Sequence, residues 1–161
     1  MDAFRLLEGY LSELGNEIAV RLKLEQDGHC IFSCKDGSDC DIAAVGNDFF
    51  VFTSIMAQRP AVDVERLYEH ALRLNDDLAV TRGATLALAA GDTIKLQLIG
   101  DANEFDYSKF KKTVGDFVLA SHAVRASFAD LVKTGGAERT QAPKPSDADL
   151  SASLDQIVLR A

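Results

Sequence analysis

The hydrophobic period changes several times along this chain, and these changes constrain its fold more than any other feature. Over residues 2–18, apolar side chains recur every three or four positions, which is typical of an amphipathic helix. From Val20 to Ile55 the period is two, and short β-branched or aromatic runs alternate with turn sequences. The pattern predicts a helix followed by an antiparallel meander, with strands at VRLKLEQ, HCIFSCK, CDIAAV and FFVFTSI.

The second half of the chain passes through the same two periods again. A second helix is predicted over residues 63–78, with Pro60 before it and Asp63 as its N-cap. The stretch ATLALAAGDTIKLQLIG predicts a β-hairpin, and a 3–4 repeat from Asp106 to Gly135 predicts a long helix. The expected fold class is therefore α+β, in the order helix, antiparallel strands, helix, β-hairpin and long C-terminal helix.

The composition changes after the long helix. The stretch GGAERTQAPKPSDAD combines adjacent glycines, prolines and mixed charges, which is typical of a flexible linker. Residues 147–160 have the pattern of a short helix, which needs a partner because so short a helix is marginal alone in water. We expect one α+β domain at 1–133, and at 134–161 a flexible linker and a short amphipathic tail.

Charge and hydropathy argue against several classes of partner. The formal net charge is -8 and the pI is about 4.8, whereas nucleic acids and anionic membranes require a basic face. The first residues lack the basic and long apolar parts of a signal peptide, and no run reaches the roughly 18 apolar residues of a membrane span. We therefore expect a cytoplasmic protein with no nucleic-acid partner and no membrane insertion.

All three cysteines lie close together in the stretch HCIFSCKDGSDC. On a strand, Cys30 and Cys34 would be about 13 Å apart, too far to bind one zinc ion together. Cys34 and Cys40 flank a turn and could approach each other, which leaves His29 and Cys30 at the far end. We expect buried, reduced, structural cysteines and no metal or other cofactor.

Catalytic motifs are missing from the sequence. The glycines follow no phosphate-binding pattern, and neither GxSxG nor HExxH occurs. His29, His70 and His122 fall in three different predicted elements, and the acidic residues are spread over turns and helix faces. The sequence therefore predicts no enzyme and no catalytic residues.

The first two helices carry apolar arcs of about 160°, wider than the roughly 100° that a single core contact needs. In the first helix, Leu6 and Tyr10 lie beside the main stripe, so the helix is either deeply buried or makes a second contact there. In the second helix, one exposed edge would form an apolar patch, which two-fold pairing would bury. We therefore expect a homodimer.

Three stretches resemble the class I type III secretion chaperones, the family that includes the Tir chaperone. LLEGYLSELG resembles the first helix of the family, and GHCIFSCKDGSDCDI resembles its strand-turn-strand. VDVERLYEHALRLNDDLAVTRGATLALAAGDTIKLQL is similar to its second helix, the turn after it and the closing hairpin. The resemblance covers residues 1 to about 133.

The resemblance implies a bacterial, cytoplasmic homodimer that binds the extended N-terminal segment of one or more effector proteins and keeps it soluble for export. It implies effector-binding grooves on the first helix and neighbouring sheet, at Leu6, Tyr10, Leu14, Ile31, Ile42 and Phe50. It implies a dimer interface on the second helix, at Leu67, Tyr68, Ala71 and Leu74. A component of the secretion apparatus is a further candidate partner.

Two other functions stay open from the sequence. One is an adaptor or signalling domain of the same fold without an export role. The other is a thiol- or metal-dependent enzyme using Cys30, Cys34 or Cys40, which would require a thiol of lowered pKa.

Overall fold

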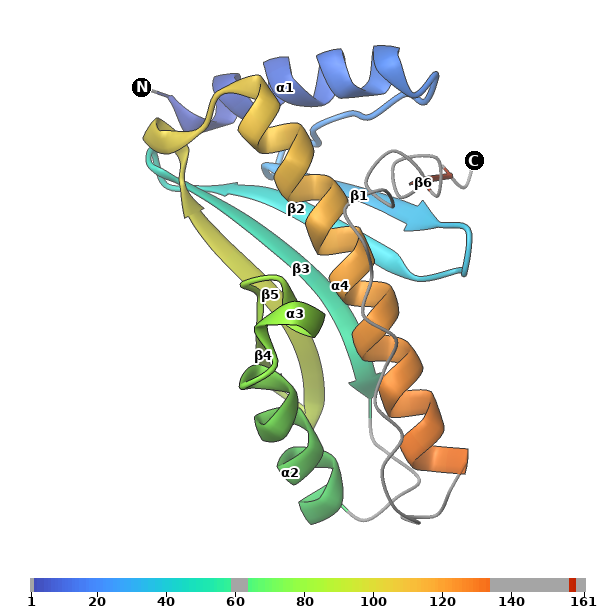
Figure 1. Cartoon of the computed structure of the whole chain (residues 1–161). Coiled ribbons are helices and arrows are strands. Elements are labelled where there is room, and N and C mark those ends of the chain that lie inside the picture. The colour runs from blue at the N-terminus through green and yellow to red at the C-terminus, as the bar shows by residue number, and fades with distance from the viewer. Residues whose placement is uncertain (1, 59–63, 134–156, 159–161) are drawn as a thin grey trace.

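The computed structural model describes residues 2–58, 64–133 and 157–158. Its elements are α1 (Ala3–Glu17), β1 (His29–Cys34), β2 (Asp39–Val45), β3 (Phe49–Gln58), α2 (Val64–Asn75), α3 (Leu78–Thr81), β4 (Thr85–Ala89), β5 (Thr93–Asp101), a 3-10 turn (Ala102–Glu104), α4 (Tyr107–Lys133) and β6 (Ile157–Val158). The predicted α+β order of helix, antiparallel strands, helix, hairpin and long helix is confirmed (Figure 1).

The strand predicted at VRLKLEQ is absent. After α1 the chain turns instead, because the backbone N–H of Val20 donates to the carbonyl oxygen of Gly15 at 2.9 Å, and Ala19 adopts a positive φ of 55°. Leu22 and Leu24 are buried but belong to no strand. The alternation of apolar and polar residues in this segment therefore reflects the burial of Leu22 and Leu24, and the segment is not part of the sheet.

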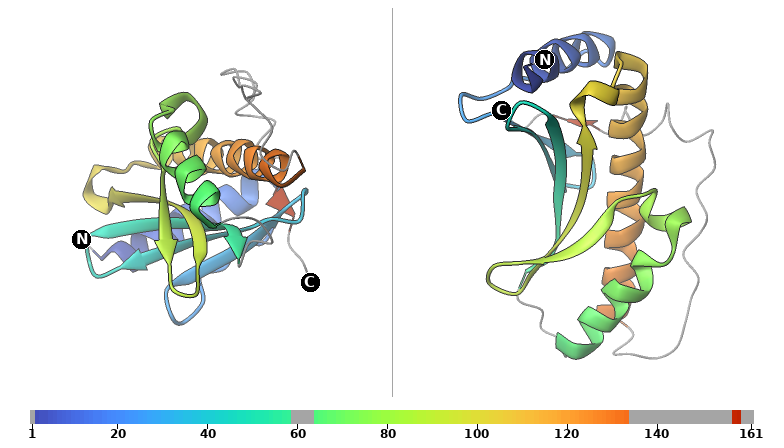
Figure 2. Two further views of the ribbon diagram at one scale, coloured as in Figure 1. Left: turned by 90° about the horizontal axis from the view of Figure 1, so that it is seen from below. Right: turned by 90° about the vertical axis from the view of Figure 1, so that its left-hand side faces the viewer.

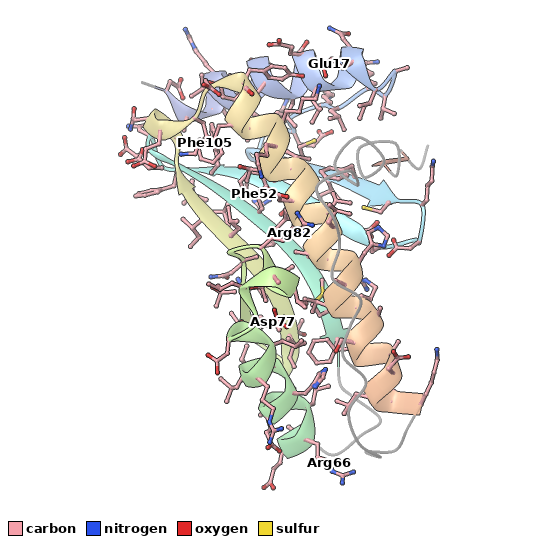
Figure 3. The ribbon with its side chains drawn as sticks, in the orientation of Figure 1. Glu17, Phe52, Arg66, Asp77, Arg82 and Phe105 are labelled. Atoms are coloured by element: carbon pink, nitrogen blue, oxygen red, sulfur yellow. The ribbon has the colours of Figure 1, made fainter. Side chains whose placement is uncertain are left out.

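The second helix ends earlier than predicted, at Asn75. Asp77 begins the short α3 by accepting hydrogen bonds from the backbone N–H groups of Ala79 and Val80. Arg82, which is labelled with Asp77 in Figure 3, then ends α3 in the left-handed conformation. Its guanidinium forms a 2.6 Å ion pair with Asp116 of α4. The predicted Asp63 cap and Pro60 lie outside the described residues.

The tail was predicted to be helical, and this is wrong at Ile157–Val158. These residues form β6, which pairs antiparallel with the Ser33–Cys34 end of β1. The free edge of β1 offers unpaired backbone groups, and β-branched residues suit an extended conformation. The rest of the predicted tail helix lies outside the described residues.

In the described part of the chain, six antiparallel strands form one sheet in the order β4-β5-β3-β2-β1-β6. The described helices lie over one face of it, with α4 running along the sheet and α1 crossing one end (Figure 2). The core between these layers contains Phe32, Ile42, Phe52, Leu96 and Phe117, all at most 2% exposed. None of the described helices is long and apolar enough to cross a membrane.

Candidate protein-binding surfaces

No described helix covers the sheet face opposite the helices (Figure 2). This face carries large apolar side chains that are exposed. Cross-strand pairs Val45–Phe49 and Val51–Ile99 belong to this face, because directly paired residues point to the same side of a sheet. We call this surface the open face and define it by its exposed apolar residues, Ile31, Val45, Phe49, Ile55 and Ile99, which are 46% to 64% exposed. Exposed apolar groups on neighbouring strands of this kind indicate a protein-binding surface.

A polar pair borders the apolar residues of the open face. His29 Nδ1 lies 2.8 Å from a carboxylate oxygen of Asp41 on the adjacent strand. This hydrogen bond raises the pKa of His29 above its ordinary value. The open face therefore combines apolar side chains with a pair whose charge depends on pH near neutrality.

A second apolar surface lies between α2 and β4. A groove of about 200 Å³ is lined there by Tyr68, Ala71, Leu72, Asn75, Leu86, Ala87, Leu88 and Ile94. Leu72 is 69% exposed and Leu88 is 58% exposed, so both offer apolar surface to a partner. We call this surface the α2–β4 groove; it adjoins β4, the outermost strand at its end of the sheet.

The residues predicted to bind effector are split between core and surface. Leu14, Ile42 and Phe50 are at most 1% exposed in the core beneath the helices. Leu6 and Tyr10 are half-buried, whereas Ile31 is 64% exposed on the open face. Ile31 is the most exposed of the predicted residues. Alternation along β1 could not decide which of the two apolar faces of this strand is open.

Tyr10 is held in an aromatic cluster between α1 and α4. Its hydroxyl donates to the backbone carbonyl of Phe105 at 2.9 Å, and its ring centroid lies 5.2 Å from that of Phe110. Phe105 in turn packs on Phe50, with ring centroids 5.4 Å apart. These contacts tie α1 to the end of the sheet, which is a structural role.

The residues predicted to form the dimer interface are likewise divided between the core and the surface. Leu67, Ala71 and Leu74 are buried, at most 9% exposed, on the side of α2 that faces the core. Tyr68 is half-buried in the α2–β4 groove beside Leu72, where its hydroxyl donates to Asp92 at 3.3 Å. The accessible edge of α2 is thus formed by Tyr68 and Leu72.

All three cysteines are buried, and none forms a disulfide. Burial raises the pKa of Cys30 to about 11, which makes this thiol unreactive. The Sγ atoms of Cys34 and Cys40 lie 4.0 Å apart, so the two cysteines flanking the turn do approach each other. The hydrogen bond from Cys40, together with the nearby ring of His122, lowers the pKa of Cys34, while the pKa of Cys40 is raised.

His122 of α4 lies beside the pair of Cys34 and Cys40. The sequence did not reveal that these residues come together. The Nδ1 atom of His122 lies 3.0 Å from a carboxylate oxygen of Asp36, in the turn between β1 and β2. We call Cys34, Asp36, Cys40 and His122 the thiol–histidine cluster. Helix α4 is far from the β1–β2 turn in the sequence, so no short sequence motif could have linked His122 to the cysteines.

Comparisons with known proteins agree with this architecture. A model of the Tir chaperone protein (CesT) family matches residues 9–125. A chain in the crystal structure of the ExsC–ExsE complex has a TM-score of 0.65 at 11% identity, over 78% of this chain and 96% of that one. A chain in the HopA1–SchA chaperone–effector complex has a TM-score of 0.60 at 10% identity, over 76% and 95%.

A third structure is similar, the heterodimeric ExoU–SpcU complex from the type III secretion system of Pseudomonas aeruginosa. Its TM-score is 0.53 at 13% identity, over 79% of this chain and 95% of that one. Likeness at such low identity shows the fold alone, and a comparison with curated proteins found no match. Because the family model spans well over half of the chain, this chain belongs to the Tir chaperone (CesT) family of type III secretion chaperones, which are not enzymes.

Proposed function

We propose that this chain is a cytoplasmic bacterial chaperone that binds the extended N-terminal segment of one or more effector proteins and keeps it soluble for export. The observation that carries the proposal is the open face, where Ile31, Val45, Phe49, Ile55 and Ile99 are exposed together on one side of the sheet. A folded domain has little reason to leave such a surface in water unless a partner covers it.

The shape of the surface favours an extended partner. Its apolar side chains are spread over four strands, β1, β2, β3 and β5, and are not gathered in one deep pocket. An unfolded segment can follow such a spread of anchors and can also add a strand to a free sheet edge. The net charge of -8 further favours a neutral or basic segment.

We further propose that the chaperone is a homodimer joined through the α2–β4 groove. Leu72 and Leu88 are exposed there beside Tyr68, and a two-fold contact would bury this apolar surface on both copies. A long extended segment that crosses both copies gains affinity from the joined surface. This arrangement leaves the open face, on the other side of the sheet, available to the effector.

The test is capture of secreted proteins encoded by the same bacterium, co-expressed with the chaperone and followed by gel filtration. The double variant Ile31→Asp/Ile99→Asp should lose the co-eluting effector, since it places a charge on each of the two outer strands of the open face, β1 and β5. Val132→Asp is the matched control, because Val132 is 52% exposed on α4 and belongs to neither proposed surface. Equal capture by the double variant and wild type, with both folded, would remove the open face from the proposal.

A further inference from the structure

The thiol–histidine cluster lies on the helix side of the sheet, away from the open face. Cys34 ends β1, Asp36 lies in the following turn, Cys40 lies in β2 and His122 comes from α4. The Sγ of Cys34, a carboxylate oxygen of Asp36 and a ring nitrogen of His122 lie within 4.8 Å of one another. The second sulfur, of Cys40, is 4.0 Å from that of Cys34.

We propose that this cluster is a binding site for a divalent transition-metal ion, with zinc as the best match. Cys34 and Cys40 supply the two sulfur ligands and His122 supplies a nitrogen ligand. Asp36 holds the imidazole ring of His122 in place. Two sulfurs and one imidazole are a ligand set that zinc prefers, and they leave a fourth position for water or a carboxylate oxygen.

The spacing from the sulfur of Cys34 to each of the other two ligand atoms fits such an ion. Two thiolates bound to tetrahedral zinc at about 2.3 Å lie about 3.8 Å apart, close to the 4.0 Å between Cys34 and Cys40. A sulfur and a nitrogen on the same ion lie about 3.5 Å apart, so side-chain movements on the order of 1 Å bring the Cys34–His122 pair to ligand distance.

The two ring nitrogens of His122 have different surroundings. Nδ1 lies 3.0 Å from Asp36, and the other oxygen of this carboxylate accepts from the backbone and hydroxyl of Ser38 at 2.8 and 2.6 Å. The Nε2 atom is buried and has no hydrogen-bond partner among the described residues. A carboxylate that fixes the tautomer through one nitrogen and leaves the other free is the usual second layer of a zinc-bound histidine.

A disulfide between Cys34 and Cys40 fits less well than a shared ion. Cys40 is paired directly with Phe32, and the N–H of Cys34 donates to Ser38, so the two cysteines are diagonal neighbours. Diagonal Cα atoms in an antiparallel sheet are about 7–8 Å apart, beyond the roughly 4.4–6.8 Å of most disulfides. An ion bridges the sulfurs without moving the strands.

An ion can reach the cluster from solvent, because the side chains of His122 and Asp36 are 27% and 28% exposed. A bound ion would fasten α4 to the β1–β2 hairpin, beside the point where β6 pairs with Cys34.

The test is a titration of the full chain, stripped of metal and kept reduced, with Co²⁺ and then with Zn²⁺. The wild type should bind one Co²⁺ per chain with the charge-transfer absorption of thiolate ligands, and Zn²⁺ should displace it and raise the melting temperature. Cys30→Ser is the matched control and should behave like wild type. Cys34→Ser and His122→Gln should lose one-to-one binding, and Asp36→Asn should weaken it by about tenfold to a hundredfold.

Melting curves of the metal-free variants show whether each one folds. If Cys34→Ser fails to fold, the Co²⁺ spectrum of the wild type and the loss of binding in His122→Gln decide the question. The proposal is overturned if the wild type shows no thiolate-to-Co²⁺ absorption, or if folded Cys34→Ser binds as tightly as wild type. Quantitative formation of a Cys34–Cys40 disulfide in the wild type under mild oxidation, with no metal bound before it, would also overturn the proposal.

Discussion

Variants at single positions can test whether a residue has a structural or a binding role, and Tyr10 is the clearest case. Tyr10→Phe removes only the hydrogen bond to Phe105 and should lower the free energy of unfolding by about 1 kcal/mol. Tyr10→Ala also removes the ring contacts with Phe110 and should cost about 2–3 kcal/mol, less than a fully buried aromatic because the residue is half-buried.

Urea denaturation of the two Tyr10 variants measures these changes. Capture of the effector by Tyr10→Phe should equal that of wild type. Loss of capture in this variant at unchanged stability would instead place Tyr10 in the binding surface, as the family resemblance implies.

His29 gives a prediction about pH. The hydrogen bond with Asp41 raises the folded-state pKa of His29, so the stabilisation from this pair is full below the unfolded pKa of about 6.5. It is lost as the pH rises through the raised folded pKa. In Asp41→Asn the pKa of His29 should fall toward its ordinary value, as measured by NMR titration, while His70 serves as the internal control. An unchanged pKa of His29 in this variant would show that the hydrogen bond with Asp41 does not raise it.

At the scale of elements, the sequence predicted the order of helices and strands but not which apolar faces are covered. Strands β1 and β3 are apolar on both sides, so alternation separates Ile31 from Phe32 without showing which one meets the helices. The answer depends on the docking of α4, a contact between distant parts of the chain. The same limit hid His122, whose partner Asp36 lies on another element.

The short strand β6 leads to a prediction for the tail. Among the described residues, truncation after Lys133 removes the two-residue pairing of Ile157–Val158 with the edge of β1, so we expect the melting temperature to change little. Amide hydrogen exchange at Ser33 and Cys34 should become faster, because the edge of β1 loses its neighbour. Loss of cooperative melting on truncation would show that the tail belongs to the core.

At the scale of the whole molecule, the proposed dimer depends on the accessible edge of α2. Leu72→Asp should give a monomer without unfolding the chain, because Leu72 is 69% exposed in the single chain. Leu74→Asp should unfold the chain, since Leu74 is 9% exposed and packs in the core. Analytical ultracentrifugation and melting curves distinguish the two outcomes, and a Leu72→Asp protein that remains dimeric would exclude the α2–β4 groove as the interface.

The central claim is that two copies of this chain hold one extended effector segment. Light scattering on the purified co-expressed complex tests it most directly. The account predicts a chaperone dimer of about 35 kDa, twice the 17.4 kDa chain, plus the mass of one effector segment. The account would be contradicted if the chain is a monomer at micromolar concentration and forms no complex with any of the co-expressed secreted proteins.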